Sequence, residues 1–121
     1  MSLPSDFYNT PIPGTGGVPM DTYFESDSID LTKGGTITAP GNIIVTYQQT
    51  LRRCCVGTMK HVLQVSTDDF TTFQEYDATN GLAFGAASGT VTNAINISTA
   101  TLGSSVVKIR FLAEDNVAYY W

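Results

Sequence analysis

INISTATLGSSVVKIRFLAEDNVAYYW, residues 95–121, contains two runs in which apolar and polar side chains alternate. The first run ends at Ile97 and the second covers residues 107–113, with a Gly-Ser-Ser turn between them. Successive side chains of a β-strand point to opposite faces of the sheet, so each run predicts a half-buried strand. Lys108 and Arg110 should then lie on the face opposite to the apolar residues of the second run.

Similar alternation recurs along the chain between polar turns. The segment from Tyr23 to Leu31 predicts a single first strand, and Asn80-Gly81 is the strongest turn signal in the sequence. Strands spaced roughly 8–15 residues apart, with no helical pattern of useful length, indicate an all-β, jelly-roll-like antiparallel β-sandwich of about eight strands. We expect the core to contain the inward-facing residues Ile29, Leu31, Ile43, Val45, Tyr47, Leu63, Val65, Ile95, Ile97, Val107, Ile109 and Phe111.

Length and composition indicate one sandwich domain preceded by an arm. A chain of 121 residues has room for a single core. Its 42% hydrophobic and only 14% charged residues favour short strands joined by polar turns. Residues 1–20 hold four of the five prolines, which predicts an extended N-terminal arm and leaves residues 21–121 as the domain.

Charge and hydropathy argue against several classes of function. Six basic and eleven acidic residues give a formal charge of -5, which disfavours nucleic-acid binding because that binding depends on neutralising phosphates. No apolar stretch approaches the roughly 20 residues that span a bilayer, so membrane insertion is not expected. The first residues lack the charged and apolar regions of a signal peptide, so a secreted native protein would carry that peptide outside this sequence.

Nothing in the sequence predicts catalysis. His61 is the single histidine, and its place at the start of an expected strand favours a surface position. The carboxylate pairs at 68–69 and 114–115 fall in expected turns, where Asp side chains bind the backbone that follows them. We therefore expect no catalytic residue and no enzyme activity.

Three segments resemble one family of extracellular modules. They are SIDL at 28–31, VLQVSTDDFTTF at 62–73 and the VKIRF…YYW pattern of the C-terminal segment. In this order they resemble the cleaved-adhesin (choice-of-anchor J) modules of secreted bacterial peptidases and adhesins, relatives of the MAM-type jelly rolls. The resemblance implies a non-catalytic binding or adhesion module, secreted or displayed at a bacterial surface, that recognises a carbohydrate or a surface protein.

The chain departs from that family at three places. Asp69 and Phe70 stand where the family usually has two turn glycines, and Phe73 stands where it usually has Trp. The sequence also stops at Trp121, before the family's acidic final strand, which predicts an open C-terminal edge through which copies associate. The alternative function is therefore a structural assembly subunit, of phage or surface-layer type, that docks through its arm and edge.

An acidic cluster near the first strand is a candidate metal site. Carboxylates supply the hard oxygen ligands that calcium prefers, and modules similar to this one often carry a structural calcium near that strand. Ordinary solvated charge is the alternative explanation. The candidate calcium ligands are Asp21, Glu25, Asp27 and Asp30.

Basic and aromatic residues supply the candidate ligand-binding positions. Positive charge is concentrated around Cys54 and Cys55, which we expect to be free thiols, on an otherwise acidic chain; the basic residues are Arg52, Arg53, Lys60 and His61. This patch is suited to an acidic glycan or protein, or it discourages pairing at an edge strand. Tyr120 and Tyr76 are candidate exposed aromatics for stacking on a sugar ring, whereas Tyr119 and Trp121 are expected in the core.

Overall fold

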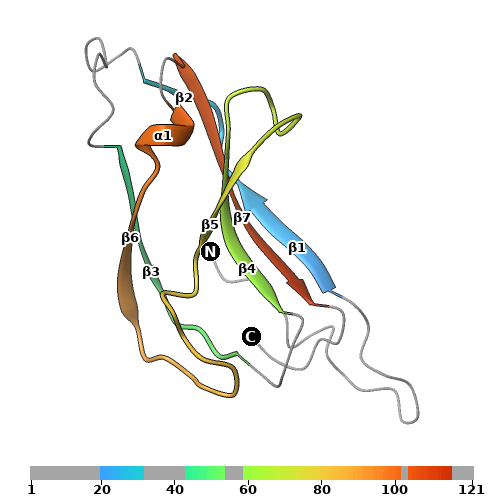
Figure 1. Cartoon of the computed structure of the whole chain (residues 1–121), viewed down its shortest axis with the longest axis vertical. Coiled ribbons are helices and arrows are strands. Elements are labelled where there is room, and N and C mark those ends of the chain that lie inside the picture. The colour runs from blue at the N-terminus through green and yellow to red at the C-terminus, as the bar shows by residue number, and fades with distance from the viewer. Residues whose placement is uncertain (1–19, 32–42, 54–58, 102–103, 116–121) are drawn as a thin grey trace.

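The structure, a computed structural model, describes residues 20–31, 43–53, 59–101 and 104–115. These residues form seven strands and one short helix, drawn in chain order from blue to red in Figure 1. The elements are β1 (Met20–Glu25), β2 (Ile29–Asp30), β3 (Ile44–Gln49), β4 (Lys60–Ser66), β5 (Gln74–Asp77), β6 (Val91–Asn96), α1 (Ser98–Thr101) and β7 (Val106–Asp115).

The strands form two antiparallel sheets that make the layers of a sandwich (Figure 1). The larger sheet has the order β1-β7-β4-β5, and β2 also pairs with β7. The smaller sheet consists of β3 and β6. This arrangement confirms the all-β antiparallel sandwich predicted from the sequence, with seven strands in the described residues where about eight were expected.

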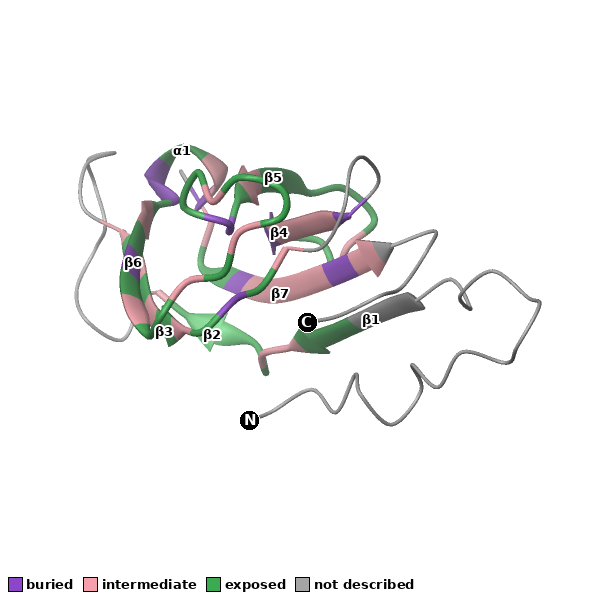
Figure 2. Cartoon of the chain, turned by 90° about the horizontal axis from the view of Figure 1, so that it is seen from below, coloured by how far each residue is buried: buried purple, intermediate pink, exposed green. Residues whose placement is uncertain are grey.

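The core lies between the two sheets. Leu63, Val65, Ile97 and Val107 are each at most 2% exposed. Buried residues occur on strands of both sheets and on α1 (Figure 2). The alternation in the sequence thus identified most of the core correctly; the partly buried residues packed on these four are Leu31, Ile43, Val45, Tyr76, Ile95, Ala100, Ile109 and Phe111.

The single first strand expected from Tyr23 to Leu31 is wrong, because a bulge divides it. Glu25 pairs with Arg110 and Ile29 pairs with Val107, so three residues of the first segment face two of β7. The extra residue keeps Phe24 and Ile29 on the same face, although their odd separation would otherwise place them on opposite faces. Ile29 is still 40% exposed, since β2 lies at the margin of the sheet, and it does not belong to the buried core as predicted.

The turn predicted at Asn80-Gly81 is confirmed. Both residues have left-handed backbone conformations, with φ of 54° and 72°, and the Leu82 N–H donates to the Thr79 carbonyl at 3.2 Å. This turn leads away from β5 into the segment that returns along residues 82–88, where Ala87 forms an isolated bridge with Arg52.

The one-turn helix α1 was not anticipated. Its first N–H, on Ser98, donates to the Asn96 side-chain oxygen at 2.9 Å, which is a capping interaction. The Ser98 hydroxyl in turn accepts the Ile43 N–H at 2.9 Å and so connects α1 to the start of β3. Figure 1 places α1 at one end of the two layers, where Ser98 and Thr101 are buried.

Several sequence predictions fall outside the described residues. They concern most of the N-terminal arm, the thiols of Cys54 and Cys55, and the C-terminal strand with Tyr119, Tyr120 and Trp121. Within the described part of the chain, no helix has the length and apolar character that crossing a membrane requires.

The difference between Leu63 and Ile29 provides a test of the core. Leu63→Ala is expected to lower the free energy of unfolding by about 2–5 kcal/mol, because it removes fully buried methyl groups and leaves a cavity. Ile29→Ala should cost about 1 kcal/mol or less, since its side chain is partly solvated. Chemical denaturation of both variants measures the two values, and equal losses would place Ile29 in the core after all.

Candidate functional site

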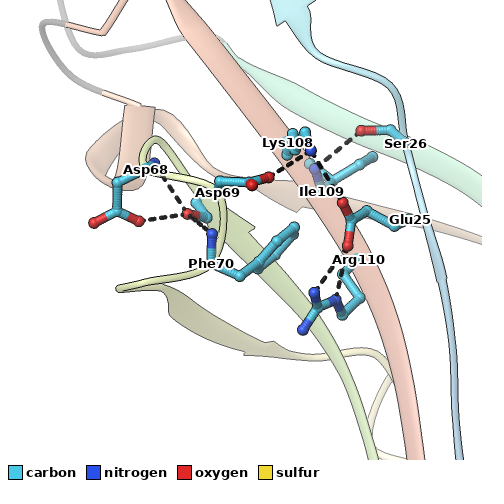
Figure 3. Close-up of polar contacts among 9 residues, drawn as sticks. Glu25, Ser26, Asp68, Asp69, Phe70, Lys108, Ile109 and Arg110 are labelled. Carbon is cyan, nitrogen blue, oxygen red and sulfur yellow. Dashed lines mark hydrogen bonds and ion pairs between the residues drawn. The ribbon is translucent and has the colours of Figure 1, made fainter.

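The outer face of the larger sheet carries a connected group of charged and aromatic side chains. Val107 and Ala113 are buried, so Lys108 and Arg110 between them face away from the core, as the alternation predicted. Glu25 lies directly opposite Arg110 in the register of β1 and β7. We call the group formed by Tyr23, Glu25, Asp69, Phe70, Lys108 and Arg110 the Arg110 platform. Figure 3 labels all of these residues except Tyr23.

Glu25 joins the two cations of the platform. Its Oε2 accepts hydrogen bonds from Arg110 Nη2 at 2.8 Å and Nε at 3.2 Å, and its Oε1 lies 3.2 Å from Lys108 Nζ. The hydrogen bond from Arg110 lowers the pKa of Glu25; desolvation opposes this effect, and the hydrogen bond from Lys108 adds to it. Glu25 is therefore a carboxylate held in place between two cations.

The loop after β4 completes the platform from the other side. Asp69 Oδ1 lies 2.5 Å from Lys108 Nζ. The guanidinium carbon of Arg110 lies 3.8 Å from the centre of the Phe70 ring and 4.4 Å from the centre of the Tyr23 ring. Arg110 thus stacks on two aromatic rings while its nitrogens hold Glu25, an arrangement that fixes a long cationic side chain on an open surface.

Asp69 and Phe70 adopt backbone conformations that favour glycine. Their φ angles are 59° and 60°, in the left-handed region, where a residue with a side chain pays roughly 1–2 kcal/mol. These are the two positions at which the resembled family usually has glycine. Strain of this kind persists where surrounding contacts impose it, and here Asp69 contacts Lys108 and Phe70 contacts Arg110.

Hydrogen bonds within the loop hold this strained turn. The Ser66 hydroxyl accepts the N–H of Phe70 at 2.9 Å and donates to Asp68 Oδ1 at 2.8 Å. The Asp68 carboxylate also accepts the N–H of Thr72 at 2.9 Å and its hydroxyl at 2.6 Å. These bonds from Thr72 and Ser66 lower the pKa of Asp68. They therefore stabilise both the charged form of Asp68 and the conformation of the turn.

The four candidate calcium ligands lie on β1, β2 and the bulge between them. Glu25 is already bound by Lys108 and Arg110, Asp27 and Asp30 are exposed, and Asp21 lies opposite Glu114 in the register. Among the described residues, no three His, Cys, Asp or Glu side chains are grouped in a way that could hold a metal ion. Calcium binding stays a prediction.

The ligand-binding candidates within the described residues lie in different parts of the structure. Arg53 Nη1 donates to the Leu82 carbonyl, and its guanidinium carbon lies 3.9 Å from the centre of the Phe84 ring. Arg52 is exposed beside it. Tyr76 is half-buried against the core and its hydroxyl donates to Gln74 Oε1 at 3.3 Å, so it is less open to a sugar ring than expected. Tyr120 lies outside the described residues.

His61 does not occupy the surface position that the sequence predicted. It is half-buried on β4, and its Nε2 lies 3.2 Å from Gln49 Oε1 of the smaller sheet. Gln49 Nε2 and the Tyr47 hydroxyl both donate to the Ala78 carbonyl, at 2.7 Å and 3.2 Å. Burial lowers the pKa of His61 and Arg53 adds to this effect, whereas Asp77 opposes it. This polar cluster links the two sheets.

Comparison with known proteins supplies no relative for this chain. No protein-family model matches the sequence, and neither a curated protein nor a solved structure matches it. The resemblance to cleaved-adhesin modules therefore stays a prediction that rests on the three sequence segments.

Exchanging glycine and alanine in the loop tests the strain. At Asp69 and at Phe70, the Gly variant should be more stable than the Ala variant by about 1–2 kcal/mol, because alanine keeps the left-handed strain and glycine removes it. At Phe73, which lacks a positive φ, the order should reverse. Denaturant unfolding of the six variants gives the comparison; alanine equal to glycine at position 70 would contradict a strained turn.

The half-buried position of His61 predicts a pH dependence of stability. The folded chain disfavours the protonated ring, whereas the unfolded chain protonates it near the ordinary value of about 6.5. Stability should therefore fall as pH decreases from about 7.5 through that value to the lowered folded pKa. His61→Gln should flatten the curve in this window, measured by denaturant unfolding, since the sequence has no other histidine. An unchanged slope would contradict the assignment.

Proposed function

We propose that the chain is a non-catalytic binding and adhesion module, displayed outside a bacterial cell, that recognises a protein surface through the Arg110 platform. The observation that carries the proposal is the strained turn at Asp69 and Phe70. Its two side chains serve an exposed surface and make no part of the buried core. Retained strain at such a place is a reason to infer function.

The composition of the platform suits a protein partner. Tyr and Arg are among the residues most enriched at the energetic centres of protein interfaces. The Tyr23 side chain is 54% exposed, and the Glu25, Lys108 and Arg110 side chains keep 22–26% of their surface. The group lies on the face of a sheet, and an open cleft of about 400 Å³ beside it includes Asp69 and Lys108 of the platform in its lining. The exposed aromatic and charged side chains, already held in place by one another, favour a protein partner.

The surroundings of the platform resemble the polar rim of an interface. Further along the same face, Lys60 Nζ lies 2.6 Å from Glu75 Oε1, which also accepts a hydrogen bond from Gln64 Nε2 at 2.8 Å. Exposed ion pairs of this kind contribute little to stability but limit which partners can approach. They extend the surface towards the size that a specific interface requires, about 800 Å² on each partner.

The described titratable groups support a binding role over catalysis. His61 lies between the sheets with Gln49, away from the platform. Glu25, Asp68 and Asp77 have lowered pKa values and accept hydrogen bonds, so each is held as an anion and none is suited to act as a general acid. The resemblance to modules of exported adhesins supports an extracellular location.

Structural assembly is the second candidate, and the position of β1 favours it. In the described residues β1 is an outer strand that pairs only with β7, so its other edge can pair with a second chain. Up to Asp115, β7 itself lies between β1 and β4. An association of copies through the described strands would therefore use β1; the C-terminal edge predicted from the sequence lies outside them.

Binding to arrays of purified extracellular proteins and of glycans tests the module against the assembly subunit. We expect a protein hit whose affinity falls at least about tenfold in Tyr23→Ala and in Phe70→Gly, because each change removes a ring that holds Arg110. Phe73→Ala is the matched control, since Phe73 is an exposed aromatic of the same loop outside the platform.

Two outcomes would contradict the proposal. A hit that both platform variants retain would place the recognition surface elsewhere. A stable oligomer by light scattering, with no hit on either array, would support the assembly subunit.

A further inference from the structure

A polar cleft lies beside β6 on the smaller sheet, remote in the topology from the platform strands β1 and β7. It has a volume of about 220 Å³ and is bounded by Tyr47, Asn93 and Ile95 on the sheet side. Asp77, Asn80 and Gly81 form the opposite wall. The second wall is the turn that the sequence predicted at Asn80-Gly81, and the structure gives both of its residues a positive φ. One wall is therefore a strand and the other a turn.

Asn93 is the unexplained residue of this cleft. It is only 5% exposed, yet neither its side-chain oxygen nor its nitrogen makes a hydrogen bond of acceptable geometry within the described structure. Burial raises the pKa of the Tyr47 hydroxyl, and the neighbouring Asn93 amide opposes this effect. A buried amide without partners is unfavourable, and an apolar residue of similar shape would remove that penalty.

The turn opposite Asn93 is rigid and negatively charged. Asp77 Oδ1 accepts the N–H of Thr79 at 3.0 Å and its hydroxyl at 2.7 Å. Among the contacts of the described residues, Asp77 Oδ2 has a single long one, 3.4 Å to the N–H of Gly81. This second oxygen keeps capacity to accept hydrogen bonds from a molecule in the cleft, and its charge disfavours an anion there.

The lining restricts the chemistry of an occupant. An amide pairs with a neighbouring donor and acceptor, which two adjacent hydroxyl groups provide: one accepts from Nδ2 and the other donates to Oδ1. The cleft is larger than the space of a single water, about 30 Å³, and smaller than typical drug-sized sites. Among the described residues that line the cleft, Asp77 is the one with a charged side chain, so a divalent cation would find a single carboxylate in this part of the lining.

We infer that this cleft binds a neutral polyhydroxylated ligand of the pyranose class, with adjacent ring hydroxyls paired to the Asn93 amide and a third donating to Asp77. The site is separate from the Arg110 platform, so the inference goes beyond the proposed function. One edge of a sugar ring enters the cleft, and the rest of a longer glycan extends into solvent through its open side.

Titration of the full chain with methyl glycosides of glucose, galactose, mannose and N-acetylglucosamine tests the site by amide NMR. At least one sugar should give saturable shifts confined to residues 77–81 and 93–95 and to the Asn93 side-chain amide. Asn93→Leu should abolish these shifts without lowering stability, because leucine fills the position and leaves no unpaired amide. Thr92→Ala, on the exposed face of the same strand, should leave the affinity unchanged.

Three results would overturn the inference. The first is the absence of saturable shifts with all four sugars. The second is binding that Asn93→Leu retains, or a loss of stability in that variant with denaturant, which would show that the amide is satisfied in the fold. The third is saturable binding of acetamide or calcium in place of the sugars. Failure of the platform variants on the arrays would leave all three readouts unchanged, so the two proposals fail independently.

Discussion

The pairing of β7 on both sides is the constraint on which the rest of the structure depends. β4 pairs with one edge of β7, and β1 and β2 pair with the other, so the strand lies in the middle of the larger sheet. Its alternation then assigns every side chain to a layer: Val107 and Ala113 are buried, whereas Lys108 and Arg110 face outward. The core and the platform therefore lie on opposite faces of the same strand.

The periodicity of the sequence predicted the fold well because it records burial. In β4 and β7 every second residue faces the core, so Leu63, Val65 and Val107 were identified from the pattern alone. The bulge before Ile29 could not be predicted, since the extra residue appears only when the pairing with the partner strand is known. The half-buried position of His61 could not be predicted either, because its partner Gln49 belongs to the other sheet.

The platform was only partly predictable. The departure from the family's two glycines indicated that Asp69 and Phe70 are unusual, and the structure gives both a positive φ. The contacts of these residues with Lys108 and Arg110 connect segments about forty residues apart, and local pattern carries no information about such pairs. Glu25 was assigned to a candidate metal site because its acidic neighbours are visible in the sequence, whereas its cationic partners on β7 are distant.

The separation between Glu25 and Arg110, 85 residues along the chain, has a consequence for biosynthesis. Contacts between such distant segments form late and slowly, because a long loop must close before they contribute any free energy. A nascent chain that has left the ribosome only as far as β6 contains Tyr23 and Glu25 but lacks the Arg110 guanidinium that contacts both. The Arg110 platform is therefore completed only when the last described strand inserts between the first and the fourth, and a chain that ends before β7 lacks both of its cations.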